Sequence, residues 1–163
     1  GIDYAFIDQT LAWLIREQQW AFASDLLERA REEWSTLNDS QKSQVLNREA
    51  SLFLQDSLRD EATAALEESI GLDPSNAEAL LQLAEVYAED NLYIQAEIMF
   101  ERATAYDLVQ QRASLGLAQL AIDQFDYPRA LTLLREISAQ NPERFDLREN
   151  IQILENLVTA RQN

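Results

Sequence analysis

The 163-residue chain contains no cysteine and no histidine. Without cysteine, the chain has no disulfide, no thiolate nucleophile and no thiol redox chemistry. Without histidine, it lacks the commonest general acid or base near neutral pH and a common zinc ligand. We therefore expect no enzyme activity, no metal and no cofactor. A cysteine-free chain suits the cytoplasm and the periplasm equally well, so its localisation stays open between the two.

Glycine and proline are also scarce, with three residues of each. The glycines stand at positions 1, 71 and 116, so no glycine-rich loop is available to bind a phosphate. No run alternates β-branched and polar residues as a strand would. No apolar run approaches the roughly 20 residues that span a bilayer, so we do not expect insertion into a membrane.

Basic residues are few: the chain has 13 of them against 29 acidic residues, which gives a net charge of −16. Most of the excess lies in segments 43–76 and 77–110, and Lys42 is the one lysine. A nucleic acid would gain little from counterion release on such a surface, so it is not an expected partner. Adjacent carboxylates such as Glu67 and Glu68 point to different faces of a helix, and no EF-hand spacing is present. A carboxylate-only cation site is therefore the weakest alternative.

A repeat of 34 residues is the strongest positive feature of the sequence. Pro74 and Pro142 are two such periods apart. Three sets of apolar residues recur at one period each: Ala50, Ala84 and Ala118; Ala62, Ala96 and Ala130; Leu66, Phe100 and Leu134. A period of this length in a helical sequence predicts a stack of two-helix hairpins, each burying its apolar face against its neighbours.

Segment 77–110 resembles a tetratricopeptide repeat (TPR) through Ala84, Tyr87, Ala96, Phe100 and Ala103. Segments 43–76 and 111–144 resemble it too, and they close with Asp-Pro and Asn-Pro. Segment 4–37 is a less regular repeat, followed by a five-residue insert at 38–42. The resemblance implies one all-α array over 1–163: a right-handed α-solenoid of about four hairpins. Segment 145–161 is then a C-terminal capping helix.

Apolar periodicity and cap residues predict nine helices. We place them at 4–17, 20–35, 41–56, 59–71, 77–90, 93–106, 111–124, 127–139 and 145–160. Ser75 and Glu78 form a capping-box pattern, while Asp126 with Pro128 indicates another helix start. The last helix has an apolar side, predicted to contain Leu147, Ile151, Leu154, Leu157 and Val158.

In the TPR family, the first helix of each hairpin lines a concave groove. The resemblance therefore implies a non-enzymatic scaffold that binds a peptide or protein segment there. The expected groove residues are Asn47, Arg48, Ser51, Gln55, Glu78, Leu81, Gln82, Glu85, Glu89, Arg112, Leu115, Gln119 and Asp123. Three glutamates share one stripe of segment 77–90, which favours a basic partner. An ordinary solvated polar face is the other interpretation of the stripe.

The alternative function is a structural module of a larger bacterial envelope, secretion or polymer-export assembly, which docks a neighbouring subunit. Trp13, Trp20 and Trp34 all lie in the irregular first repeat, so the N-terminal end is a candidate docking surface. Trp20 is expected to pack at a hairpin turn. Trp34 either contacts another subunit or packs under the insert at 38–42.

Overall fold

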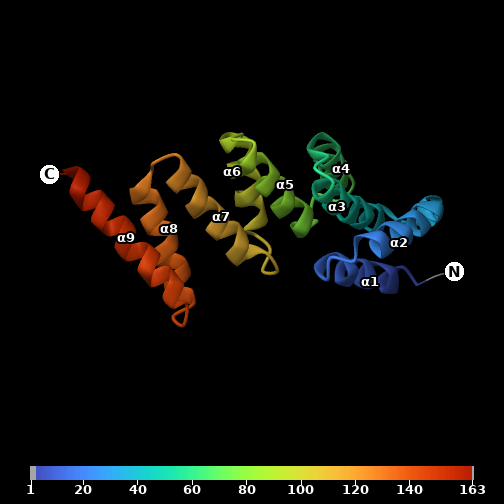
Figure 1. Ribbon diagram of the computed structural model, residues 1–163, viewed down its shortest axis with the longest axis horizontal. Helices are drawn as coiled ribbons and strands as arrows, with labels where there is room; N and C mark the ends of the chain where they lie inside the picture. Colours follow the sequence, from blue (N-terminus) through green and yellow to red (C-terminus); the bar gives the residue numbers. More distant parts are fainter. Residues whose placement is uncertain (1–2, 163) are drawn as a thin grey trace. The chain divides into compact units, whose positions relative to one another are not determined.

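The computed structural model describes residues 3–162, with side chains through residue 160. The chain divides into unit 1, residues 1–86, and unit 2, residues 87–163 (Figure 1). Unit 1 contains α1 (Tyr4–Arg16), α2 (Trp20–Glu32), the short 3-10 helix η1 (Trp34–Thr36), α3 (Asp39–Gln55), α4 (Arg59–Leu72) and most of α5 (Ala77–Glu89). Unit 2 contains α6 (Tyr93–Ala103), α7 (Gln110–Asp123), α8 (Tyr127–Gln140) and α9 (Phe145–Gln162).

The predicted all-α fold class is confirmed, since the described residues form helices and no strand. Each predicted helix is present, with ends that differ from the prediction by three residues or fewer. Within the units, α1 packs on α2, α3 on α4, and α7 on α8. The repeat phase is confirmed by burial, because Ala62, Ala96 and Ala130 all have 0% exposed area. Alanine at these positions lets neighbouring helices approach closely.

The turn inside each hairpin has the same backbone conformation. Gln18, Ser57, Asn91 and Phe125 all have a positive φ, between 56° and 62°. The last three are 34 residues apart, and Gln18 precedes Ser57 by 39 because the five-residue insert lies between them. In each turn, the N–H of the residue after the left-handed one donates to the carbonyl five residues earlier. For example, the Asp126 N–H donates to the Ala121 carbonyl at 2.8 Å. These are Schellman motifs, which normally place glycine or asparagine at the left-handed position.

Phe125 is a poor residue for a left-handed turn, so Phe125→Asn should stabilise unit 2. A left-handed conformation costs an ordinary residue about 1–2 kcal/mol, and asparagine tolerates it better. The Phe125 side chain is exposed and makes an edge-on contact with Tyr127 at 6.4 Å between centroids, so little packing is lost. We expect the free energy of unfolding, measured in urea, to rise by about 1 kcal/mol.

The reverse substitution is the matched control. Asn91→Phe places phenylalanine at the equivalent turn and also removes the acceptor of the Tyr93 hydroxyl, which lies 2.7 Å from Asn91 Oδ1. It should lower the free energy of unfolding. If Phe125→Asn were itself destabilising, the aromatic contact with Tyr127 would outweigh the backbone strain.

Helix α3 begins earlier than predicted because residues of the insert form its first turn. Asn38 Oδ1 accepts the Gln41 N–H at 2.9 Å, and Gln41 Oε1 accepts the Asn38 N–H at 3.0 Å. This reciprocal pair is a capping box. Trp34 packs beside the insert, with the Arg31 guanidinium 4.2 Å and the Lys42 Nζ 5.8 Å from its ring centroid. Trp34 is partly buried there, as the second of its two interpretations expects.

The predicted capping role of Ser75 is wrong, and Asn76 takes that role instead. The Ser75 N–H and hydroxyl both donate to Asp73 Oδ1, at 3.0 and 2.6 Å. Asn76 Oδ1 accepts the Ala79 N–H at 3.1 Å, as an N-cap does. Hydrogen bonds from the hydroxyls of Ser75 and then Ser40 hold the pKa of Asp73 below its ordinary value. The Asp73 carboxylate competes for Ser75, which the sequence pattern alone does not reveal.

Helix α9 packs on α8 (Figure 1). Its apolar side makes the contact. Leu147 and Leu154 are buried in a cluster with Leu134 and Ile137 of α8. Leu157 was predicted on that side, but it is 44% exposed. The reason is helical geometry: positions 147, 151, 154 and 158 follow one stripe, and 157 lies about 100° away from 158.

Candidate functional site

The first helices of unit 1 are joined by polar side chains, which we call the polar ladder: Asp8, Arg48, Asn47, Gln82 and Ser51. Arg48 of α3 donates to Asp8 of α1 through Nε at 3.0 Å and Nη2 at 3.4 Å. Asn47 Nδ2 donates to Gln82 Oε1 of α5 at 2.7 Å, and Gln82 Nε2 donates to Ser51 Oγ at 2.9 Å. The ladder fixes donors and acceptors on the face where the resemblance places the groove.

Tyr4 adds a further link between α1 and α3. Its hydroxyl donates to the Gln41 carbonyl oxygen at 2.9 Å. Burial, followed by the nearby Asp8 carboxylate, raises the pKa of Tyr4 above its ordinary value, although the positive charge of Arg48 acts the other way. The tyrosine therefore stays neutral and keeps its proton for this hydrogen bond.

The predicted groove residues of unit 1 differ in accessibility. Asn47 is 4% exposed and Leu81 is fully buried, so these two present almost no surface to a partner. Leu81 is enclosed because α5 is buried around most of its circumference. Partly or fully exposed are Arg48, Ser51, Gln55, Glu78, Gln82 and Glu85. The accessible part of the predicted groove in unit 1 is thus polar, and it contains fewer residues than predicted.

The remaining predicted groove residues belong to unit 2. Glu89 is exposed at the end of α5, and Arg112, Gln119 and Asp123 are exposed on α7. Leu115 of α7 is partly buried in the cluster that α7 forms with α8 and α9. Gln119 Nε2 donates to Asp123 Oδ1 at 2.8 Å, one helical turn away.

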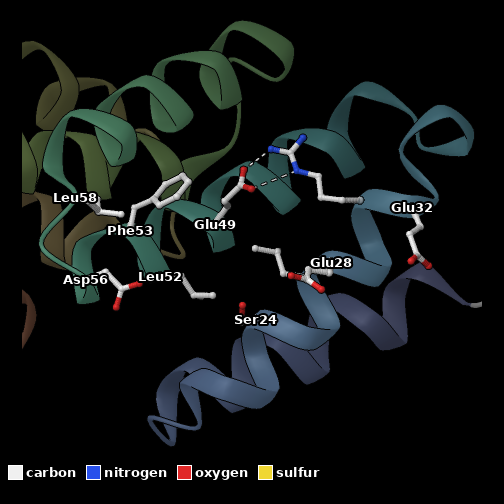
Figure 2. Close-up of a pocket in the computed structure, with 10 residues that line it drawn as sticks. Ser24, Glu28, Glu32, Glu49, Leu52, Phe53, Asp56 and Leu58 are labelled. Atoms are coloured by element: carbon white, nitrogen blue, oxygen red, sulfur yellow. Dashed lines mark hydrogen bonds and ion pairs between the residues drawn. The ribbon is translucent and has the colours of Figure 1, made fainter.

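A cleft between α2 and α3 in unit 1 was not anticipated from the sequence. Figure 2 shows it, and we call it the α2–α3 cleft. Its volume is about 550 Å³. Ten residues line it: Ser24, Leu27, Glu28, Arg31, Glu32, Glu49, Leu52, Phe53, Asp56 and Leu58. A second cavity of about 240 Å³ shares Ser24, Leu52 and Asp56 with it and extends it towards Trp20.

The α2–α3 cleft combines an apolar floor with carboxylates at its edge. Leu52 and Phe53 of α3 are partly buried in the floor. Glu28 of α2 and Asp56 at the end of α3 are exposed and come from opposite walls (Figure 2). The repeat phase identifies second-helix packing positions, but it does not indicate that a cleft lies between α2 and α3. The acidic pair Glu28 and Glu32, four residues apart on α2, is a sequence signal that could have indicated this surface.

One wall of the α2–α3 cleft is held by an ion pair. Arg31 contacts both carboxylate oxygens of Glu49, with Nε 3.3 Å from Oε1 (dashed in Figure 2). The same guanidinium lies over the Trp34 ring. Two parallel contacts to one carboxylate and a stacked ring together fix an arginine side chain. Arg31 is therefore engaged with the protein.

Neither a metal centre nor a membrane span is found in the part of the chain that the structure describes. There, no three acidic side chains cluster as metal ligands would. Likewise, no described helix combines the length and the apolar character that crossing a bilayer requires.

Comparison with known proteins gives structural matches alone. No family model and no curated protein matches the chain. The TPR domain of Arabidopsis OM64 is similar at 18% identity and TM-score 0.65, covering 73% of this chain and 98% of that domain. A tetratricopeptide repeat protein from Parabacteroides merdae is similar at 20% identity and TM-score 0.68, over 96% of this chain and 59% of that one.

A third structure contains nearly identical TPR-like repeats of a putative kinesin light chain from Podosopora anserina. It is 16% identical, with a TM-score of 0.74, and the match covers 97% of this chain and 88% of that one. At such identities the likeness establishes a shared fold.

Proposed function

Since the chain has the tetratricopeptide-repeat fold, we propose that it is a non-enzymatic scaffold that binds a segment of a partner protein. The polar ladder of unit 1 is the observation that carries this proposal. It holds α1, α3 and α5 together through side-chain hydrogen bonds, so the accessible groups beside it are pre-organised. A surface ordered before binding loses less conformational freedom when a partner docks.

The partner we propose for this face is a basic segment. Glu78 and Glu85 lie two turns apart on α5 and are both partly exposed. The whole chain carries a net charge of −16, so its field attracts cations and repels polyanions. Electrostatic complementarity of this kind acts mainly on the association rate.

Docking to a neighbouring subunit is the second candidate function, and α1 supports it. Phe6 and Trp13 are seven residues apart, so they share one side of α1, and they are 67% and 50% exposed. Exposed aromatic side chains are enriched at protein interfaces. An envelope, secretion or export assembly that buries this side of α1 is the form in which we propose this alternative.

Replacing Glu78 and Glu85 by glutamine tests the basic partner. The variant keeps side-chain size and helix propensity but removes two charges. We expect slower association and a weaker dependence of the association rate on salt. The melting temperature should change little. The measurement is surface-capture kinetics at low and physiological salt, with a partner first isolated by pull-down on the wild-type chain.

The matched control removes two charges elsewhere, through Glu136→Gln and Glu143→Gln on exposed positions of unit 2. It should leave the association rate close to wild type. Equal rates for wild type and the Glu78/Glu85 variant would refute the acidic first-helix surface. Loss of binding in Trp13→Ser instead would favour docking through α1.

A further inference from the structure

We propose that the α2–α3 cleft is a second docking site, which takes a basic amphipathic helix from a partner protein. The helix would insert leucine or phenylalanine side chains into the cleft and place arginine or lysine at its edge. This site lies on α2 and α3 and uses none of the polar-ladder side chains. It therefore stands independently of the function proposed for the first helices.

The size and lining of the cleft suit the inserted side chains. Its volume of about 550 Å³ lies within the range of roughly 300–1,000 Å³ that is usual for small-molecule sites. Leu52, Phe53 and the 41% exposed Leu58 offer an apolar floor. An amphipathic helix typically binds such a groove through a few apolar anchors spaced along one face.

The negative charge at the edge of the α2–α3 cleft favours binding of a cationic helix. Glu28, Glu32 and Asp56 are exposed around the cleft (Figure 2). The one basic residue of the lining, Arg31, is paired with Glu49. Arginine or lysine flanking the apolar anchors would meet carboxylates on both walls, which is electrostatic complementarity.

A second copy of the chain is the less favourable occupant. The cleft carries four carboxylates and one guanidinium, and the chain has a net charge of −16. Two such molecules would bring like charges together, which opposes association. A partner of opposite charge meets no such barrier.

The test uses the intact chain and a synthetic peptide as the probe. The peptide carries leucine at helical i, i+3, i+4 and i+7 positions and lysine elsewhere. One matched peptide replaces lysine by glutamate, and another replaces leucine by glutamine. Titration calorimetry should show binding of the leucine–lysine peptide, and at least tenfold weaker binding of both matched peptides.

Ser24→Arg assigns the binding to the cleft. Ser24 is exposed and lines both parts of the cavity, so arginine there fills space and adds positive charge without disturbing the core. We expect about a tenfold or greater loss of peptide affinity. Gln111→Arg, on an exposed position of α7, makes the same charge change in unit 2 and should have little effect. Circular dichroism checks that both variants fold.

A triple variant separates charge from shape. Glu28→Gln, Glu32→Gln and Asp56→Asn together should weaken the peptide and flatten its salt dependence. The control, with Glu136, Glu143 and Glu149 replaced by glutamine, removes as much charge from exposed positions of unit 2. The Glu78/Glu85 variant should bind the peptide as wild type does, so the two sites are tested separately.

Three results would overturn the proposal. Equal affinities of wild type and Ser24→Arg would exclude the cleft as the site. Equal losses in Ser24→Arg and Gln111→Arg would indicate attraction to the overall charge alone. A concentration-dependent dimer that Ser24→Arg abolishes, seen by sedimentation, would make a second copy the occupant.

Discussion

Deleting residues 145–163 should unfold the end of unit 2 and promote aggregation. The deletion removes α9, whose Leu147 and Leu154 are 2% and 5% exposed against α8. Burying a leucine side chain contributes about 1.5–3 kcal/mol, so the loss is roughly 3–6 kcal/mol for the pair. The newly uncovered apolar side of α8 would face water. Circular dichroism should show loss of more helix than α9 itself contains, and light scattering should show association.

The control for this deletion lies on the same helix. Ile153 and Leu157 are 51% and 44% exposed, on the side of α9 away from the cluster. Replacing both by glutamine should leave helicity and melting temperature nearly unchanged. A deleted chain that stayed monomeric, with α8 still helical, would show that α9 is dispensable for the hairpin beneath it.

Gly116→Ala should destabilise unit 2, although alanine is the better helix former. A Cβ atom at position 116 of α7 would lie 2.3 Å from Cε1 and 2.4 Å from Cζ of Phe100. Phe100 is 3% exposed, so its ring has little room to move. Overpacking of this kind typically costs about 1–3 kcal/mol, and each kcal/mol lowers the melting temperature by roughly 2–4 °C in a chain of this size.

Gly71→Ala is the matched control and should act in the opposite direction. Position 71 also lies in a helix, α4, but no heavy atom comes within 4 Å of a Cβ built there. The substitution should therefore stabilise the protein by up to about 1 kcal/mol through helix propensity. Thermal unfolding of the two variants gives the comparison. Similar melting temperatures would mean that α7 shifts away from Phe100 at no cost.

A second substitution tests the cause of the Gly116→Ala effect. Phe100→Leu removes the ring that the new methyl group meets. The two changes should be less destabilising together than their separate effects add up to, because residues in contact are coupled. Strict additivity would point to a cause other than the contact with Phe100.

The helices and their register were predictable because the signals are local. A 34-residue period fixes which alanines are buried, and Ala50, Ala84 and Ala118 are at most 1% exposed. Asp126 does cap α8, accepting the Arg129 N–H at 3.2 Å. The capping box of Asn38 and Gln41 was also present in the sequence, three residues apart as such pairs are. Asn38 and Gln41 both lie in the insert at 38–42, outside the 34-residue period that predicts the other helices.

The candidate surfaces were less predictable because they depend on neighbouring helices. Leu81 has the spacing of a groove residue, yet packing around α5 buries it completely. Asn47 has a polar side chain at the predicted position, but that side chain is buried and donates a hydrogen bond to Gln82 of the adjacent first helix. The α2–α3 cleft is lined by residues of two helices that are distant in the sequence, and no spacing within one helix predicts it.

The tryptophans have a consequence for how folding of this chain is followed. Trp13, Trp20 and Trp34 all belong to unit 1. Intrinsic tryptophan emission therefore originates in unit 1 alone, whereas far-ultraviolet circular dichroism reports the helices of both units. Coincident transitions by two probes are a standard criterion of two-state unfolding. Comparing tryptophan emission with circular dichroism therefore shows, without an introduced label, whether unit 1 unfolds together with the rest of the chain.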